Sequence, residues 1–123
     1  MAIQTNVQHC VVVHTIKGES TTQDILSYLY EESPSWHDLP SIWDITDLAC
    51  ETVSTADIRL LASGILSRPS RKSNHKIAIL VKSNLGHGLV RMLQGYLGCQ
   101  YQDCLQVHRS ADQAYQWLYF GQE

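Results

Sequence analysis

The segment from Lys76 to Val81, which reads Lys-Ile-Ala-Ile-Leu-Val, constrains the fold of this chain most strongly. Its side chains are apolar at consecutive positions from Ile77 to Val81, so both faces of the predicted strand are hydrophobic. Such a strand must be covered on both sides, which is typical of the central strands of a mostly parallel sheet. We therefore expect a buried central strand in an α/β domain.

Further strand and helix patterns alternate along the chain. Apolar or β-branched runs predict three more strands, at Cys10 to Ile16, Ser41 to Ile45 and Leu105 to His108. A segment with helical periodicity follows each strand, and the first of these helices is expected from about Thr21 to Tyr30. This order implies right-handed crossovers. We expect one domain, residues 1 to 123, in which a mostly parallel four- or five-stranded sheet is flanked by about four helices.

The helix boundaries are marked by residues that cap helices. Capping-box spacing is present at Ser20 with Gln23, Ser54 with Asp57, and Ser110 with Gln113. In the third helix, Asn84 is the expected cap and Gly98 the expected terminator, in the left-handed conformation. The side chains of this helix that are predicted to face one way are Leu85, Leu89, Met92, Leu93 and Tyr96.

Composition excludes several classes of protein. Hydrophobic residues make up 44% of the chain and charged residues 17%, so we expect a packed domain with disorder only in about six N-terminal and three C-terminal residues. The net charge of -3 gives no reason to expect nucleic acid or an anionic membrane as a partner. Without a signal-peptide pattern or a long apolar run, the sequence indicates a cytoplasmic protein with no integral membrane association.

The cysteines do not indicate a metal site. Their positions, Cys10, Cys50, Cys99 and Cys104, include no Cys-x-x-Cys pair, and the histidines supply no second pair of ligands. A domain of this size with an adequate core does not need disulfides, so we interpret them as reduced thiols. No metal or cofactor is expected.

Three segments occur together in a familiar order: Ile42 to Asp47 (Ile-Trp-Asp-Ile-Thr-Asp), Gly88 to Leu93 (Gly-Leu-Val-Arg-Met-Leu) and Val107 to Leu118 (Val-His-Arg-Ser-Ala-Asp-Gln-Ala-Tyr-Gln-Trp-Leu). The chain resembles the SpoIIAA-like family of small STAS-type domains, which has a strand ending in Trp-Asp, a Gly-Leu-x-Arg-Met helix and a closing Ala-x-x-Trp-Leu helix. The resemblance spans about Ser41 to Leu118. It implies a mixed sheet flanked by helices, related to anti-sigma-factor antagonists and to CRAL-TRIO lipid-transfer domains.

This resemblance implies binding or regulation, because most members of the family have no assigned reaction. Phosphorylatable antagonists carry Asp-Ser-[Ser/Thr]-Gly at a helix start, where this chain has Val53-Ser54-Thr55-Ala56. Ser54 and Thr55 are candidate phosphorylation sites, since a phosphate there would face the positive end of a helix dipole. A simple N-cap role for Ser54 is the favoured alternative.

The best candidate ligand site is the segment Asn84-Leu85-Gly86-His87-Gly88, which opens a helix after a buried strand. Backbone N–H groups at Asn84, Gly86, His87 and Gly88 could converge on a phosphate or carboxylate, with Arg91 one helical turn further on. Close packing of the helix on the sheet is the alternative explanation for the glycines. A surface ion pair is the alternative for Arg91.

Other candidate groups have simpler explanations. Asp44 and Asp47 end a strand where a receiver domain holds its phospho-accepting aspartate, but the acidic pair that such a domain needs is missing, so turn capping by Asp47 is favoured. Cys10 and His14 share one strand face, where packing is favoured over nucleophilic catalysis. A solvated loop is the favoured explanation for the cluster of positive charges at Arg68, Arg71, Lys72 and Lys76.

Aromatic residues crowd the C-terminus, and no single helix face can bury all four: Tyr115, Trp117, Tyr119 and Phe120. They are expected to form a homodimer surface, to line an apolar pocket or to cap the core.

We expect a non-enzymatic domain that binds a small apolar or amphipathic ligand. The polar end of the ligand would lie near Asn84, Gly86 and Arg91, and Trp117 would belong to its aromatic walls. The alternative is a protein-interaction switch controlled by phosphorylation at Ser54 or Thr55.

Overall fold

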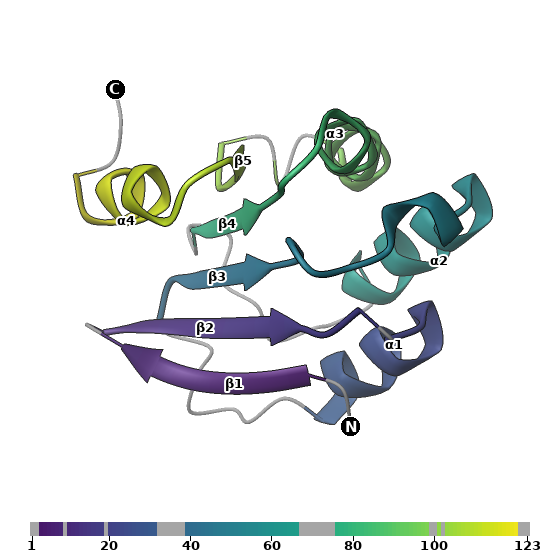
Figure 1. Ribbon diagram of the computed structural model, residues 1–123, viewed down its shortest axis with the longest axis horizontal. Coiled ribbons are helices and arrows are strands. Elements are labelled where there is room, and N and C mark those ends of the chain that lie inside the picture. Colours follow the sequence, from purple (N-terminus) through teal and green to yellow (C-terminus); the bar gives the residue numbers. More distant parts are fainter. Residues whose placement is uncertain are drawn as a thin grey trace.

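The computed structural model describes residues 3–8, 10–18, 20–31, 39–66, 76–98, 101 and 103–120. Strands and helices alternate after an N-terminal hairpin (Figure 1). In chain order the elements are β1 (Ile3–Gln8), β2 (Val11–Ile16), α1 (Thr22–Glu31), β3 (Ser41–Asp44), the 3-10 helix η2 (Cys50–Thr52), α2 (Thr55–Leu66), β4 (Ile77–Leu80), α3 (Asn84–Leu97), β5 (Leu105–His108) and α4 (Ala111–Phe120). The disorder expected for the last three residues lies outside the described part of the chain.

The sheet is mixed and mostly parallel. Its five strands lie in the order β1-β2-β3-β4-β5. Strand β1 is antiparallel to β2, whereas the three remaining pairs are parallel. The expected α/β class, the mostly parallel sheet and the set of four helices are therefore confirmed.

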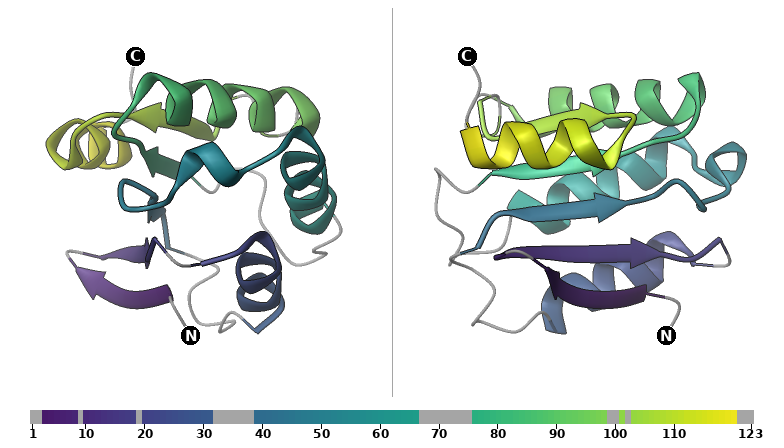
Figure 2. Two further views of the ribbon diagram at one scale, coloured as in Figure 1. Left: turned by 45° about the vertical axis from the view of Figure 1, so that its right-hand side comes forward. Right: turned by 60° about the vertical axis from the view of Figure 1, so that its left-hand side comes forward.

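The helices are distributed unequally over the two faces of the sheet. Each of the three crossovers between parallel strands moves one strand further in the same direction. Right-handed crossovers of this kind put their helices on one face, and α1, α2 and α3 do lie together there (Figure 1). Helix α4 follows the last strand and covers the other face, where it stands in front of the sheet in the right-hand view of Figure 2.

The strand β1 is a feature that the sequence analysis missed. Disorder was expected over about the first six residues, but Ile3–Gln8 forms an edge strand that pairs with β2 from Ile3 opposite Ile16 to Gln8 opposite Val11. Cys10 lies in the turn of this hairpin with φ of 65° and is exposed. The prediction that Cys10 shares a strand face with His14 is therefore wrong, because the strand begins only at Val11.

The core is divided by the sheet into two layers. Along β4, Ile77 and Ile79 pack with α2 and α3, while Ala78 and Leu80 pack with α4. Strand β4 is buried at every position, as predicted, but it lies next to the edge strand β5, and the central strand of the sheet is β3. The apolar residues on both faces of β4 follow from helices covering it on both sides.

Two of the four helix starts agree with the sequence. Ser54 and Asp57 form a reciprocal capping box at α2, and Ser110 accepts a hydrogen bond from the N–H of Gln113 at α4. The other two starts are shifted by one residue.

Helix α1 is capped by Thr21 with Asp24, not by Ser20 with Gln23. Helix α3 is capped by Ser83, whose hydroxyl accepts from the N–H of Gly86, and Asn84 is its first helical residue. In both helices the observed cap is directly next to the predicted one in a run of small polar residues. Gly98 ends α3 with a positive φ of 83°, as predicted, but its ψ of -166° lies outside the left-handed helical region.

The buried face of α3 agrees only in part with the expected one, since Leu93 is buried and Leu89 is half-buried against the core. Its buried residues are Gly86, Val90, Leu93 and Leu97. Three members of the predicted stripe, Leu85, Met92 and Tyr96, are exposed. The two stripes are offset by one residue, so periodicity alone does not distinguish them.

Candidate functional site

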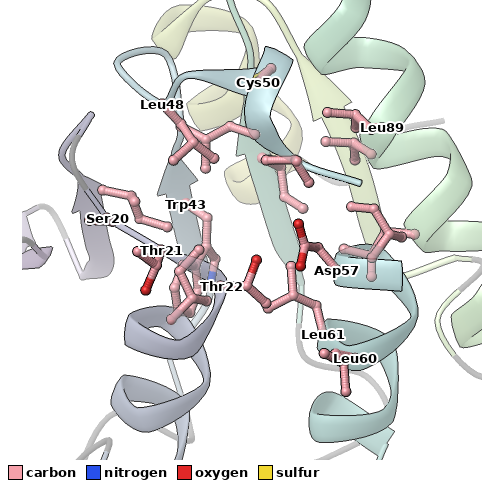
Figure 3. Close-up of a pocket in the computed structure, with 18 of the residues that line it drawn as sticks. Ser20, Thr21, Thr22, Trp43, Leu48, Cys50, Asp57, Leu60, Leu61 and Leu89 are labelled. Atoms are coloured by element: carbon pink, nitrogen blue, oxygen red, sulfur yellow. The ribbon is translucent and has the colours of Figure 1, made fainter. Parts of the chain in front are cut away.

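A cavity of about 540 Å³ lies between the sheet and the three helices on its more heavily covered face (Figure 3). Most of its lining is apolar: Ile16, Ile25, Trp43, Ile45, Leu48, Val53, Ile58, Leu60, Leu61, Ile65, Ile77, Ile79, Leu89, Val90, Leu93 and Leu105. The polar lining residues are fewer: Ser20, Thr21, Thr22, Gln23, Cys50, Thr52 and Asp57. The volume and the mainly apolar lining are typical of pockets for small organic ligands.

The strands supply one wall of the cavity through their alternating side chains. Trp43 of β3, Ile77 and Ile79 of β4, and Leu105 of β5 all face the layer of α1, α2 and α3. Trp43 also stacks on the ring of His14, with ring centroids 4.2 Å apart. His14 is fully buried, and its Nδ1 lies 2.7 Å from the Tyr28 hydroxyl. The ring on which Trp43 stacks is therefore itself held by a hydrogen bond.

Helices α1 and α2 form walls of the cavity opposite the sheet. The two helices approach each other closely at Gly64 and Leu26, which do not line the cavity. A Cβ atom on Gly64 would lie 2.6 Å from Cδ2 of Leu26, so the missing side chain allows α2 to contact α1 there. The lining residues Thr22 and Asp57 lie at the N-terminal ends of the same two helices (Figure 3). These polar groups of the cavity therefore lie between the two helices near their first turns.

Asp57 projects into this region and is the one acidic residue among the described residues that line the cavity (Figure 3). Its carboxylate accepts a hydrogen bond of 2.9 Å from the backbone N–H of Ser54. That bond, with smaller contributions from the side chains of Ser54 and Thr22, lowers the pKa of Asp57 below its ordinary value. Asp57 is consequently ionised at neutral pH.

Cys50 lines the cavity from η2. Burial raises the pKa of its thiol, and the neighbouring charge of Glu51 raises it further. A thiol is nucleophilic only as the thiolate, so Cys50 is poorly suited to attack a substrate at neutral pH. It contributes a weakly polar surface instead.

The predicted ligand residues lie outside this cavity. None of Asn84, Gly86, His87, Gly88, Arg91 and Trp117 lines the cavity. Asn84 is exposed and its Oδ1 accepts a 2.7 Å hydrogen bond from Arg109. A Cβ atom on Gly86 would lie 3.3 Å from that of Val81, which agrees with close packing on the sheet, whereas a Cβ on Gly88 would meet nothing within 4 Å.

His87 and Arg91 border a second hollow, which is separate from the cavity. It has a volume of about 670 Å³ and lies beside α3 and the edge strand β5. Its other described lining residues are Gln94, Gly95, Gly98, Leu105, Gln106 and Val107. The Gln94 side chain donates a 2.7 Å hydrogen bond to the carbonyl of Leu105 and thereby joins the helix to the strand.

Trp117 lies on the other face of the sheet. It is buried among residues of β2, β3, β4 and α4, and the ammonium group of Lys76 lies 5.4 Å from its ring centroid. It therefore packs in the core beneath α4. Trp43, which was predicted as a strand residue and as part of the family motif but not as a ligand residue, is the aromatic residue among the described residues that line the cavity.

Ser54 and Thr55 are both exposed at the start of α2. The Ser54 hydroxyl accepts a 3.1 Å hydrogen bond from the N–H of Asp57, so Ser54 has the N-cap role that was favoured for it. Asp57, its partner in the capping box, lines the cavity, which places the candidate phosphorylation sites beside this region.

The remaining candidate groups form structural contacts. Asp44 accepts hydrogen bonds from the N–H and the hydroxyl of Thr46, and Asp47 accepts one of 2.9 Å from the N–H of Gly18. Asp47 thus ties two loops together, in agreement with the favoured capping role. A Cβ on Gly18 would lie 2.8 Å from the Asp47 carbonyl oxygen, so this approach requires glycine.

Part of the basic cluster cannot be placed, because Arg68, Arg71 and Lys72 lie outside the described residues. Within the described part of the chain, no three His, Cys, Asp or Glu side chains are grouped so that they could hold a metal ion. The helices described here are all too short or too polar to cross a membrane.

Comparisons with models of protein families, with curated proteins and with solved structures found no match to this chain. The physical case for a function therefore depends on the cavity and its lining.

Proposed function

We propose that this protein is a non-enzymatic binding domain that holds a small apolar or amphipathic ligand in the cavity beneath α1, α2 and α3. The observation that carries the proposal is an apolar cavity of about 540 Å³ with polar groups at the helix starts. Burial of an apolar ligand there would release about 25 cal/mol for each Å² of apolar surface removed from water. The polar groups would orient the ligand.

The chemistry of the lining supports binding more than catalysis. Cys50 has a raised thiol pKa, and the pKa of Asp57 is lowered, so Asp57 is a weak base. The described residues that line the cavity include no histidine that could activate either side chain. A reaction would need an activated nucleophile or a general base with a tuned pKa.

The SpoIIAA-like assignment is part of the same proposal. A mixed sheet flanked by helices agrees with what the sequence resemblance implies about the fold. The relation of that family to lipid-transfer domains adds to the case for an apolar ligand. A switch controlled by phosphorylation at Ser54 or Thr55 is the weaker alternative, because a phosphate on Ser54 would break the capping box and place negative charge beside Asp57.

Binding of the neutral dye Nile red and its displacement by decanol test the proposal directly. Val53 lines the cavity and Val13 packs on the other face of the sheet, and both are half-buried. Val53→Trp should fill the cavity and abolish the rise in dye fluorescence, whereas the matched change Val13→Trp should leave it as in the wild type. Circular dichroism establishes that both variants are folded.

Equal dye binding by the two variants, or no binding by the wild type, would overturn the proposal. Native mass spectrometry of freshly purified protein provides a route to the natural ligand. We expect an adduct that is lost on denaturation and that is absent from Val53→Trp.

A further inference from the structure

We infer that the natural ligand joins an apolar body to a non-anionic polar end that donates hydrogen bonds, such as a primary ammonium or a hydroxyl group. This inference rests on the proposed function and adds the chemical class of the ligand. It follows from the charge and the hydrogen-bonding capacity of the cavity.

Asp57 is the one carboxylate among the described residues that line the cavity, and those residues include no lysine, arginine or histidine. The uncharged polar residues of the lining are mainly hydroxyl-bearing: Ser20, Thr21, Thr22 and Thr52. A ligand entering this space therefore meets one negative charge and no compensating cation from the described lining.

The Asp57 carboxylate retains capacity to accept further hydrogen bonds. It receives one from the N–H of Ser54, and the nearby side chain of Thr22 contributes to its lowered pKa. A carboxylate offers about four acceptor positions, so at least about two remain. Figure 3 shows Asp57 and Thr22 projecting toward one another from the two helices, at the place where a polar end would lie.

The helix dipoles do not reverse this preference. The starts of α1 and α2 carry partial positive charge, which favours anions. Each start is already neutralised by its own capping carboxylate, Asp24 in α1 and Asp57 in α2. A ligand carboxylate would be repelled by Asp57, whereas an ammonium group would be attracted and a hydroxyl could donate to it.

Three ligands of equal chain length test the inference: decylamine, decanol and decanoate, titrated into the protein by isothermal calorimetry at neutral pH. We expect decylamine to bind most tightly and decanoate to bind about tenfold more weakly or worse, since attraction is replaced by repulsion. Asp57→Asn should remove this preference and change decanol binding little. The matched control Asp24→Asn alters the other capping carboxylate, which does not line the cavity, and should keep the wild-type ranking.

The wild-type ranking decides the inference even if Asp57→Asn fails to fold. Decanoate binding as tightly as decylamine, with Val53→Trp still blocking all three ligands, would overturn the inference and leave the proposed function in place. Failure of all three ligands to bind would overturn both.

Discussion

The Asp57 carboxylate of α2 and the side chain of Thr22 in the first turn of α1 project toward one another, so polar groups of the two helices meet beside the cavity (Figure 3). Together with the bonds from Ser54, this contact lowers the pKa of Asp57. A carboxyl group whose pKa is lowered by folding stabilises the protein above its unfolded-state pKa of about 4, and this stabilisation is lost as the pH falls through the folded-state value.

Thr22→Val should therefore raise the pKa of Asp57 toward its ordinary value without fully restoring it, because the larger effect of the Ser54 N–H remains. Carboxyl-carbon NMR titration measures this change. The loss of stability with acid should become shallower in the variant. Thr55→Val, at an exposed position, should leave the titration unchanged, and an unchanged Asp57 pKa in Thr22→Val would contradict the contact.

The capping box of α2 should be visible in unfolding experiments. Ser54→Ala removes the hydroxyl that accepts from the N–H of Asp57 and should cost about 1 kcal/mol of unfolding free energy. Thr55→Ala, at an exposed helical position, serves as the matched control and should change stability by less than about half of that amount. Chemical denaturation measures both, and equal effects would argue against the capping role.

The two glycines of the predicted ligand segment should respond in opposite directions to alanine. Gly88→Ala places a methyl group in open space on a helix and should stabilise the protein by about 0.5–1 kcal/mol. Gly86→Ala would press against Val81 and should destabilise it by about 1–3 kcal/mol. Thermal unfolding of the two variants compares them. Stabilisation by both changes would show that α3 does not depend on close packing at Gly86.

His108 should make stability depend on pH. Burial lowers the pKa of its imidazole, and its Nε2 atom has no hydrogen-bond partner in the described part of the chain. The unfolded state therefore binds more protons below about pH 6.5, the ordinary histidine pKa, and stability should decrease as the pH falls through that value toward the folded-state pKa. His108→Leu should reduce this slope in denaturation measured from pH 7.5 down to about 5. An identical slope in the variant would contradict the account.

Much of the fold follows from local patterns in the sequence. Apolar runs such as Ile77–Leu80 identify the parallel strands, and the three consecutive crossovers determine which face carries three helices. Strand β1 was missed because polar residues occupy most of Ile3–Gln8, and only its pairing with β2 makes it a strand. Pairing between residues that are far apart in the sequence, such as Ile3 and Ile16, cannot be recognised from a local sequence pattern.

The cavity could not be predicted in the same way. It depends on the separation of α1 from α2, which packing at Gly64 and Leu26 helps to set. The run Ser20-Thr21-Thr22-Gln23 was interpreted only as a helix start, although all four residues line the cavity. The predicted ligand residues were chosen at the carboxyl ends of strands, where sheets with a reversal of strand order bind ligands. The strand order here follows the sequence without reversal, so this sheet has no such switch point.

The position of a bound ligand distinguishes the cavity from the other face of the sheet. Isoleucine methyl groups report on both faces of the sheet, since Ile45, Ile65 and Ile79 line the cavity whereas Ile42 is buried on the side of α4. With methyl-labelled protein and decanol, intermolecular nuclear Overhauser effects should connect the alkyl chain to Ile45, Ile65 and Ile79 and should be absent at Ile42. Contacts at Ile42 without contacts at the three lining residues would contradict the proposed site.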